Sequence, residues 1–188
     1  MVLFCFSLVP LDDHWGGWFF FRLLRSSFFL FPPGLMLHQG DGVQQDLPRA
    51  MAYLEKATGH PQAQYLLATM LNKDPEQQTR AFGLFVEAAK SELDRAQFNA
   101  GYCYFMGKGV GQDFAKAAEY FQLAAEQGFV YAQVNLGNML SEGRGVARDL
   151  ERAKRYFRMA APFNAHAKVT LQEIEEEEGK EGKGRKQE

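Results

Sequence analysis

A repeat with a period of 36 residues dominates the second half of this 188-residue sequence. When the segment that starts at Ala96 is shifted by 36 positions, at least eleven residues fall on identical residues, far more than chance places in one register. A recurring unit of this length is one supersecondary element that buries its apolar face against its neighbours. We therefore expect a stack of similar units. The matching pairs include Ala96/Ala132, Gly101/Gly137, Gly107/Gly143, Gly109/Gly145, Val110/Val146, Asp113/Asp149, Ala117/Ala153, Tyr120/Tyr156, Phe121/Phe157, Ala124/Ala160 and Ala125/Ala161.

Two weaker copies precede these units. A shift of 67 residues towards the N-terminus from the unit at 95–128 marks the first copy. The second copy lies between the first copy and that unit, and it has Asn72-Lys73-Asp74-Pro75 in place of the Gly-x-Gly turn. We place the units at about 34–58, 62–90, 95–128 and 131–161, followed by the start of a further helix at 165–171. The positions that identify the first copy are Gly34, Gly40, Gly42, Val43, Asp46, Ala50, Tyr53 and Ala57.

Each unit has the pattern of two helices. Ala117, Tyr120, Phe121 and Ala124 have the i, i+3, i+4, i+7 spacing of one helical face. Asp113 precedes this run, where its carboxylate can accept hydrogen bonds from the first helical turn. In the preceding helix of each unit, Gly101 and Gly137 suggest close helix packing that offsets the cost of a helical glycine, roughly 1 kcal/mol. The sequence therefore predicts an all-α fold, an α/α superhelical solenoid of about four helix-pair repeats.

The loop Gly107-Lys108-Gly109-Val110-Gly111 has two interpretations. Three glycines in five residues are also found in phosphate-binding loops, whose backbone N–H groups approach an anion. No strand precedes this loop, however, and Gly-x-Gly-Val recurs at 40–43 and 143–146. We favour a structural joint in which glycine supplies a positive φ at the helix end and the valine packs between the two helices.

The residues from Ala96 to Gly128 resemble one complete Sel-1-like repeat, a relative of the tetratricopeptide repeat. The resemblance is carried by Ala96-Gln97-Phe98-Asn99-Ala100-Gly101, Gly107-Lys108-Gly109-Val110, Tyr120-Phe121 and Ala124-Ala125-Glu126-Gln127-Gly128. It covers roughly 34–171 and implies a right-handed superhelix that serves as a scaffold for protein complexes, often in stress signalling or quality control at membranes. Some cysteine-rich bacterial relatives are linked to penicillin binding. Cys103 has Met139 at its repeat-equivalent position, so this hydrolase branch is not the one we expect.

Composition argues against several kinds of chemistry. A net charge of −2 lacks the basic excess that nucleic-acid binding needs. The four histidines are not spaced with Cys, Asp or Glu as metal ligands, and the two cysteines form no CxxC pair. We therefore expect a non-enzymatic protein with no catalytic, cofactor or metal site.

Partner binding is the function that remains, and two surfaces are candidates. Stacked helix pairs create a concave face lined by the first helix of each unit. On those helices Asn99, Tyr102, Asn135 and Asn138 fall outside the packing positions and are our candidate groove contacts, although ordinary exposed polar residues have the same pattern. The second candidate is a basic patch in the last repeat that would dock an acidic segment, unless the glutamates at 173 and 175–178 screen it. The patch consists of Arg144, Arg148, Arg152, Arg155 and Arg158, with Lys154 and Lys168 beside them.

The two ends of the chain differ from the repeats. Residues 1–33 contain eight of the seventeen phenylalanines, and we interpret them as an irregular aromatic extension joined at Gly34, because Pro32-Pro33 should break the first helix of that unit. A secretory signal, a membrane span, and a mitochondrial presequence or interfacial anchor are alternatives. Residues 172–188 carry nine acidic or basic residues between Glu175 and Lys186 and should form a charged disordered tail.

The expected function is that of a protein–protein interaction adaptor, located in the cytoplasm. The alternative is a stress-signalling or quality-control factor tethered to the endoplasmic reticulum or mitochondrial membrane through residues 1–33. Nucleic acid is not an expected partner in either case.

Overall fold

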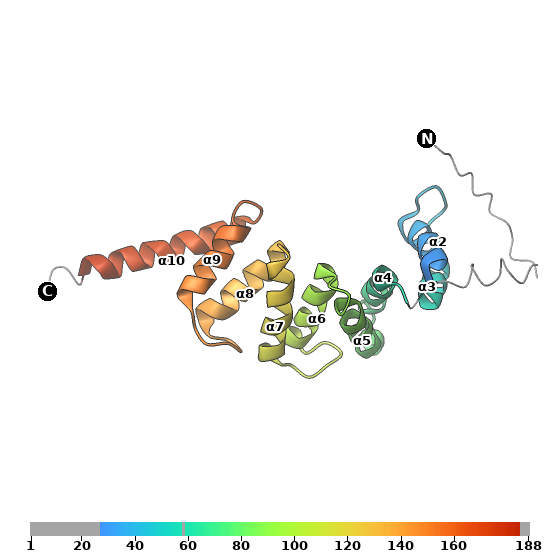
Figure 1. Ribbon diagram of the computed structural model, residues 1–188, viewed down its shortest axis with the longest axis horizontal. Coiled ribbons are helices and arrows are strands. Elements are labelled where there is room, and N and C mark those ends of the chain that lie inside the picture. Colours follow the sequence, from blue (N-terminus) through green and yellow to red (C-terminus); the bar gives the residue numbers. More distant parts are fainter. Residues whose placement is uncertain (1–26, 58, 185–188) are drawn as a thin grey trace, which may run out of the picture.

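The computed structural model describes residues 27–57 and 59–184, and all of their regular structure is helical (Figure 1). This confirms the all-α prediction. The described helices are α2 (Ser27–Gln39), α3 (Leu47–Lys56), α4 (Pro61–Leu71), the short 3-10 helix η1 (Pro75–Gln77), α5 (Gln78–Ala89), α6 (Asp94–Met106), α7 (Phe114–Glu126), α8 (Val130–Glu142), α9 (Leu150–Ala160) and α10 (Ala165–Gly184).

The helices pack as consecutive pairs. α2 lies on α3, α4 on α5, α6 on α7 and α8 on α9, and each pair then contacts the next through α3 and α4, α5 and α6, α7 and α8, and α9 and α10. In Figure 1 the pairs follow one another along the long axis without crossing back. This is a solenoid, in which each unit contacts only its neighbours.

A repeated glycine lets the two helices of a unit approach closely. A Cβ atom on Gly101 would lie 2.9 Å from the Phe121 ring, and one on Gly137 would lie 2.8 Å from the Phe157 ring. Both rings are fully buried. The predicted role of these glycines is confirmed, because any side chain there would push the helices apart.

An aspartate begins the second helix in three of the four units. In each case its carboxylate accepts a hydrogen bond from the backbone N–H three residues later, at 2.9–3.0 Å. The predicted N-caps are thereby confirmed. The pairs are Asp46 with Arg49, Asp113 with Lys116, and Asp149 with Arg152.

The Gly-x-Gly loop is a structural joint, as predicted, and its second glycine has a role that sequence reasoning missed. Gly107 and Gly143 end α6 and α8 in the left-handed conformation, with φ of 71° and 72°. Gly109 and Gly145 also have a positive φ, and they lie against the first residues of the second helix in the preceding unit. A Cβ atom on Gly145 would lie 2.5 Å from the Cβ of Phe114. The loop therefore connects units as well as helices.

The predicted break at Pro32-Pro33 is wrong, because α2 runs through both prolines. Tertiary packing offsets the loss of the two backbone hydrogen bonds that the prolines cannot donate. The Phe31 ring stacks on His60 at a centroid distance of 4.4 Å, and a Cβ atom on Gly34 would lie 3.0 Å from Leu54. The first unit is thus a helix pair that begins before Gly34. The rest of the aromatic extension, residues 1–26, lies outside the described residues.

The prediction of a disordered tail from Gln172 is also wrong for residues 172–184, which continue α10. Asn164 caps this helix by accepting a hydrogen bond from the Ala167 N–H at 3.1 Å, and Ala167 is fully buried. Leu171 and Ile174 pack on the core formed by α7, α8 and α9. These contacts fix the first half of the helix, from which the glutamate-rich part extends.

Candidate functional site

The four predicted groove residues lie on one side of α6 and α8. The buried face of α6 consists of Ala96, Gln97, Ala100, Gly101 and Cys103. At 100° per residue, Asn99 and Tyr102 point away from the centre of that face, and the 36-residue repeat places Asn135 and Asn138 likewise on α8. All four are half-buried. We call these four residues the groove row.

Two aromatic residues extend the groove row. The Phe98 ring lies 6.2 Å from the Tyr102 ring and 6.3 Å from the Tyr131 ring, and it contacts Phe129 at 5.1 Å. Tyr131 is 62% exposed. Aromatic side chains that are held by neighbours and remain accessible are frequent anchors in protein interfaces. The sequence analysis did not select Phe98 or Tyr131, because the contact joins two different units.

The carboxamides of the groove row differ in their hydrogen bonding. Asn99 donates through Nδ2 to the carbonyl oxygen of Arg95 at 2.7 Å, within its own helix. Within 27–57 and 59–184, no side-chain hydrogen bond is made by Asn135 or Asn138. Asparagine is a weaker helix former than alanine or lysine. The carboxamides of Asn135 and Asn138 therefore contribute no hydrogen bonds to the described part of the repeats, unlike that of Asn99.

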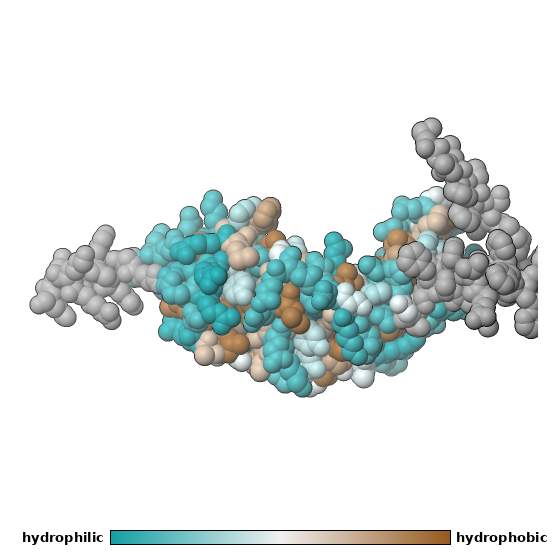
Figure 2. Space-filling model, in the orientation of Figure 1, coloured by the Kyte–Doolittle hydropathy of each residue, from teal (hydrophilic) through white to brown (hydrophobic). Residues whose placement is uncertain are grey.

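Charge is distributed unevenly between the first and second helices of the units. The first helices α4, α6 and α8 contain three Asp, Glu, Lys or Arg residues among 37, and these are Asp94, Arg95 and Glu142, near helix ends. The second helices α5, α7 and α9 contain ten among 36. Figure 2 shows mostly hydrophilic surface over α8 to α10, and an outline that dips between this end and the α2–α3 end.

Two members of the predicted basic patch are structural. Arg148 donates through Nε to the carbonyl oxygen of Ser141 at 2.9 Å, which satisfies the end of α8. Gln112 and Gln45 make the same bond at the equivalent loops. The Arg144 guanidinium lies 5.6–5.8 Å from the centres of two rings of the neighbouring unit and forms an ion pair with Glu142 at 2.7 Å.

Two further cations of the patch are paired within the chain. Arg158 forms an ion pair with Glu175 on α10 at 2.8 Å, and Lys154 is nearly buried and pairs with Glu151. The expected screening by tail glutamates is therefore present at Arg158. Arg152 and Arg155 are exposed, and their side chains form no ion pair with the residues that the structure describes. Charge neutralisation leaves a smaller basic surface than the sequence suggested.

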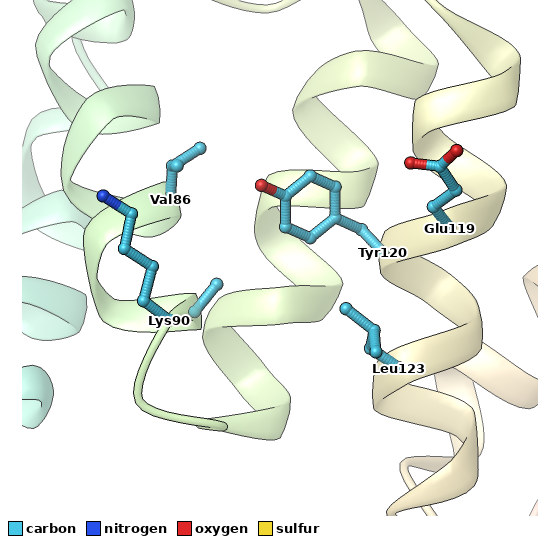
Figure 3. A pocket seen from close by; sticks show the side chains of 6 residues that line it. Val86, Lys90, Glu119, Tyr120 and Leu123 are labelled. Carbon is cyan, nitrogen blue, oxygen red and sulfur yellow. The ribbon is translucent and has the colours of Figure 1, made fainter.

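A pocket of about 320 Å³ lies between α5 and α7 (Figure 3). Burial raises the pKa of the Tyr120 hydroxyl, with a smaller effect from Tyr104. Lys90, at the opposite wall, is paired with Glu87 at 2.7 Å. This lining contains no set of groups that resembles a nucleophile with its base. The lining residues are Val86, Ala89, Lys90, Glu119, Tyr120 and Leu123.

Of the two cysteines, Cys103 is the one that lies among the described residues, and its environment disfavours reactivity. It is buried and free, and burial raises the pKa of its thiol to about 11. A reactive cysteine needs a lowered pKa and access to solvent. Among residues 27–57 and 59–184 there is no cluster of three His, Cys, Asp or Glu side chains placed to hold a metal ion. No helix in that part of the chain is long and apolar enough to cross a membrane.

Comparison with known proteins identifies the repeat. The Sel1 repeat profile matches residues 28–58, 61–92, 94–129 and 130–161. The chain belongs to the Sel1 repeat family. The resemblance predicted from the sequence is confirmed, and the first match includes both Pro32 and Pro33. Repeats of this family usually mediate protein–protein interactions and are generally non-catalytic.

Two solved Sel1-type structures are similar to this chain. One is c5321, a protective antigen of uropathogenic Escherichia coli with an SLR fold, at a TM-score of 0.71 and 32% identity over 79% of this chain and 33% of that protein. The other is a Sel1 repeat protein from Oxalobacter formigenes, at a TM-score of 0.71 and 28% identity over 80% of this chain and 64% of that protein. The chain thus spans less than two thirds of the length of both relatives.

A third structure shares only the fold. Cysteine-rich protein B of Helicobacter pylori matches at a TM-score of 0.55 and 24% identity, over 70% of this chain and 99% of that protein. No curated protein sequence matches the chain significantly. The comparisons therefore give the family and the architecture of this Sel1 repeat protein, and they name no partner.

Proposed function

We propose that this Sel1 repeat protein is a non-enzymatic scaffold that binds partner proteins along the groove row. The observation that carries the proposal is the placement of Asn99, Tyr102, Asn135 and Asn138 on one side of α6 and α8, half-buried and outside the packed core. Side chains that only filled the core would face the second helices. The family's usual role in protein–protein interaction supports the same conclusion.

Site-specific photocrosslinking tests this proposal. A photoreactive phenylalanine derivative is introduced in living cells at Tyr102 or Tyr131, which are on the groove side, and at Gln122 on α7 as the control. We expect discrete adducts with partner proteins from the two groove positions and none from the control. Equal adducts from all three positions, or none from the groove positions, would refute groove binding.

We propose the cytoplasm as the location, since an unpaired buried Cys103 suits a reducing compartment. Tethering at the endoplasmic reticulum or mitochondrial membrane depends on residues 1–33, of which 1–26 lie outside the described residues. Fractionation of cells that express the chain with and without residues 1–26 distinguishes the two locations. A shift of the protein from membranes to the soluble fraction on deletion would support the tether.

A further inference from the structure

We propose that residues 1–26 of this chain pack on the open face of α2, which consists of Pro33, Met36 and Leu37. The occupant of this surface is thus an aromatic segment of the same chain, which closes the first end of the solenoid. The inference goes beyond the proposed function, because the groove row lies on α6 and α8.

The two glycines that pack against a second helix give the register between α2 and α6. A Cβ atom on Gly34 would lie 3.0 Å from the side chain of Leu54 on α3, and one on Gly101 would lie 2.9 Å from the Phe121 ring on α7. Leu54 and Phe121 are 67 positions apart, as are the two glycines. Each residue of α2 therefore corresponds to the residue of α6 that is 67 positions later.

In the internal units, one face of the first helix packs on the second helix of the preceding unit. Cys103 of α6 is 2% exposed and lies in a core cluster with Ala81 and Phe85 of α5. Met139, the equivalent residue on α8, is also 2% exposed and lies in a core cluster with Ala118 of α7. These positions are buried because a second helix precedes them in the stack.

α2 has the same face, but no helix among residues 27–57 and 59–184 precedes it. Met36 corresponds to Cys103 and is 43% exposed, and Pro33 and Leu37 on the same face are half-buried. α2 contains no Asp, Glu, Lys or Arg, and its apolar residues lie on all sides. Helices of this kind are normally buried. In Figure 1, α2 and α3 form one end of the row of helices, so the open face has room for another segment.

Residues 1–26 have the composition that suits this face. Sixteen of these 26 residues are apolar, among them Trp15, Trp18 and the phenylalanines at 19–21. Contact with the open face would remove apolar surface of both from water. The segment joins α2 directly at Ser27. A short tether gives a millimolar effective concentration, so the segment competes well against a second copy of the chain for the same face.

The length of the segment is sufficient to cover α2. The second helices α3, α5 and α7 have 10, 12 and 13 residues, and three or four residues connect each of them to the next first helix. A segment that covers α2 in the same way needs 14–16 residues. Residues 1–26 exceed this length.

Tryptophan fluorescence of the full chain tests the inference, because its two tryptophans, Trp15 and Trp18, both lie in residues 1–26. In the parent protein we expect blue-shifted emission and weak quenching by acrylamide, relative to the protein in urea. Met36→Lys should shift the emission to longer wavelength and raise the quenching constant about twofold, because a charge on the open face resists desolvation. Far-UV circular dichroism should show unchanged helicity, since lysine is as good a helix former as methionine.

Met106→Lys is the matched control. Met106 is 47% exposed at the end of α6, and Met36 is 43% exposed in the last turn of α2. A lysine near the C-terminus of either helix interacts favourably with the helix dipole. Met106→Lys should keep the emission and the quenching constant of the parent. Equal changes for the two variants, or none for Met36→Lys, would overturn the proposal.

Photocrosslinking identifies the occupant of the open face. A photoreactive phenylalanine derivative at Met36 should form an adduct within one chain, which mass spectrometry of the digested protein maps to residues 1–26. The same derivative at Met106 should form no adduct with that segment. An adduct with the mass of two chains would identify a second copy as the occupant and overturn the proposal. Tryptophans that are exposed in the parent and become shielded only with phosphatidylcholine–phosphatidylserine vesicles would also overturn it, because the segment would then bind a membrane.

Discussion

The second glycine of the loop before α9 has no room for a side chain. Gly145 has a φ of 72°, and a Cβ atom there would lie 2.5 Å from the Cβ of Phe114 and 2.6 Å from its carbonyl oxygen. Phe114 begins α7 in the preceding unit. Gly145→Ala would therefore strain the backbone and also force the third and fourth units apart.

The loop of the first unit separates these two effects. Gly42 occupies the equivalent position with the same φ of 72°, yet a Cβ atom there would meet nothing within 4 Å. Gly42→Ala should cost only the left-handed strain, about 1–2 kcal/mol. Gly145→Ala adds the overpacking of a close contact, typically about 1–3 kcal/mol. We expect a total loss of about 2–5 kcal/mol in the free energy of unfolding.

Urea denaturation followed by far-UV circular dichroism measures this difference, with linear extrapolation of the free energy of unfolding. Hydrogen exchange of the amides in α7 and α8 shows whether the damage is located at the joint between the two units. Gly109→Ala should behave like Gly145→Ala, because its Cβ atom would overlap the backbone of Gln78. Equal losses for Gly42→Ala and Gly145→Ala, or a loss of less than about 1 kcal/mol for the latter, would refute the inter-unit contact.

Three further predictions test the core, the thiol and a helix cap. Gly137→Ala should lower the free energy of unfolding by about 1–3 kcal/mol, because its Cβ atom would lie 2.8 Å from the Phe157 ring. Gly83→Ala, in open space on α5, should raise the free energy of unfolding by about 0.5–1 kcal/mol. Equal effects of the two substitutions in urea titrations would contradict the close contact at Gly137. In a Cys5→Ser background, Cys103 should not react with a thiol reagent at pH 8 until urea unfolds the chain, since its pKa is raised to about 11; rapid labelling of the folded protein would show that the site is open. The backbone N–H of Lys116 lowers the pKa of Asp113, so its stabilising effect should be present above the unfolded pKa of about 3.9 and be lost as pH falls through the folded value. Asp113→Ala should accordingly destabilise the protein at pH 7 and match the parent once the pH has fallen below the folded pKa of Asp113, and a gap that does not close in acid would contradict the capping role.

The repeat period allowed much of the fold to be predicted from the sequence. The helix pairs, the capping aspartates and the close approach of Gly101 to Phe121 depend on residues within one unit, and the register aligns those residues in every copy. Two predictions failed because tertiary packing outweighed local preference: the helix break at Pro32-Pro33 and the disorder of residues 172–184. Pro32 and Pro33 disfavour a helix, yet Phe31 on His60 and Gly34 on Leu54 hold α2 together.

The candidate site was predictable only in part. Asn99 and Asn135 were selected as candidates by exclusion from the packing positions of their helices, which a helical period alone can do. Tyr131 was not, because its significance depends on Phe98 in the preceding unit. Arg148 resembled one cation of a patch until the structure showed its guanidinium on the carbonyl oxygen of Ser141.

The sequence by itself therefore determined the family, the helix pairs and the near absence of charge on α4, α6 and α8, since these are properties of composition and period. The tertiary structure decided what happens between units: which glycine is pressed against a neighbouring backbone, which arginine is already bonded, and which aromatic ring remains accessible. The physical reason is that a solenoid is stabilised by contacts between adjacent units, and a repeat period fixes the order of those units but not the distances between their side chains.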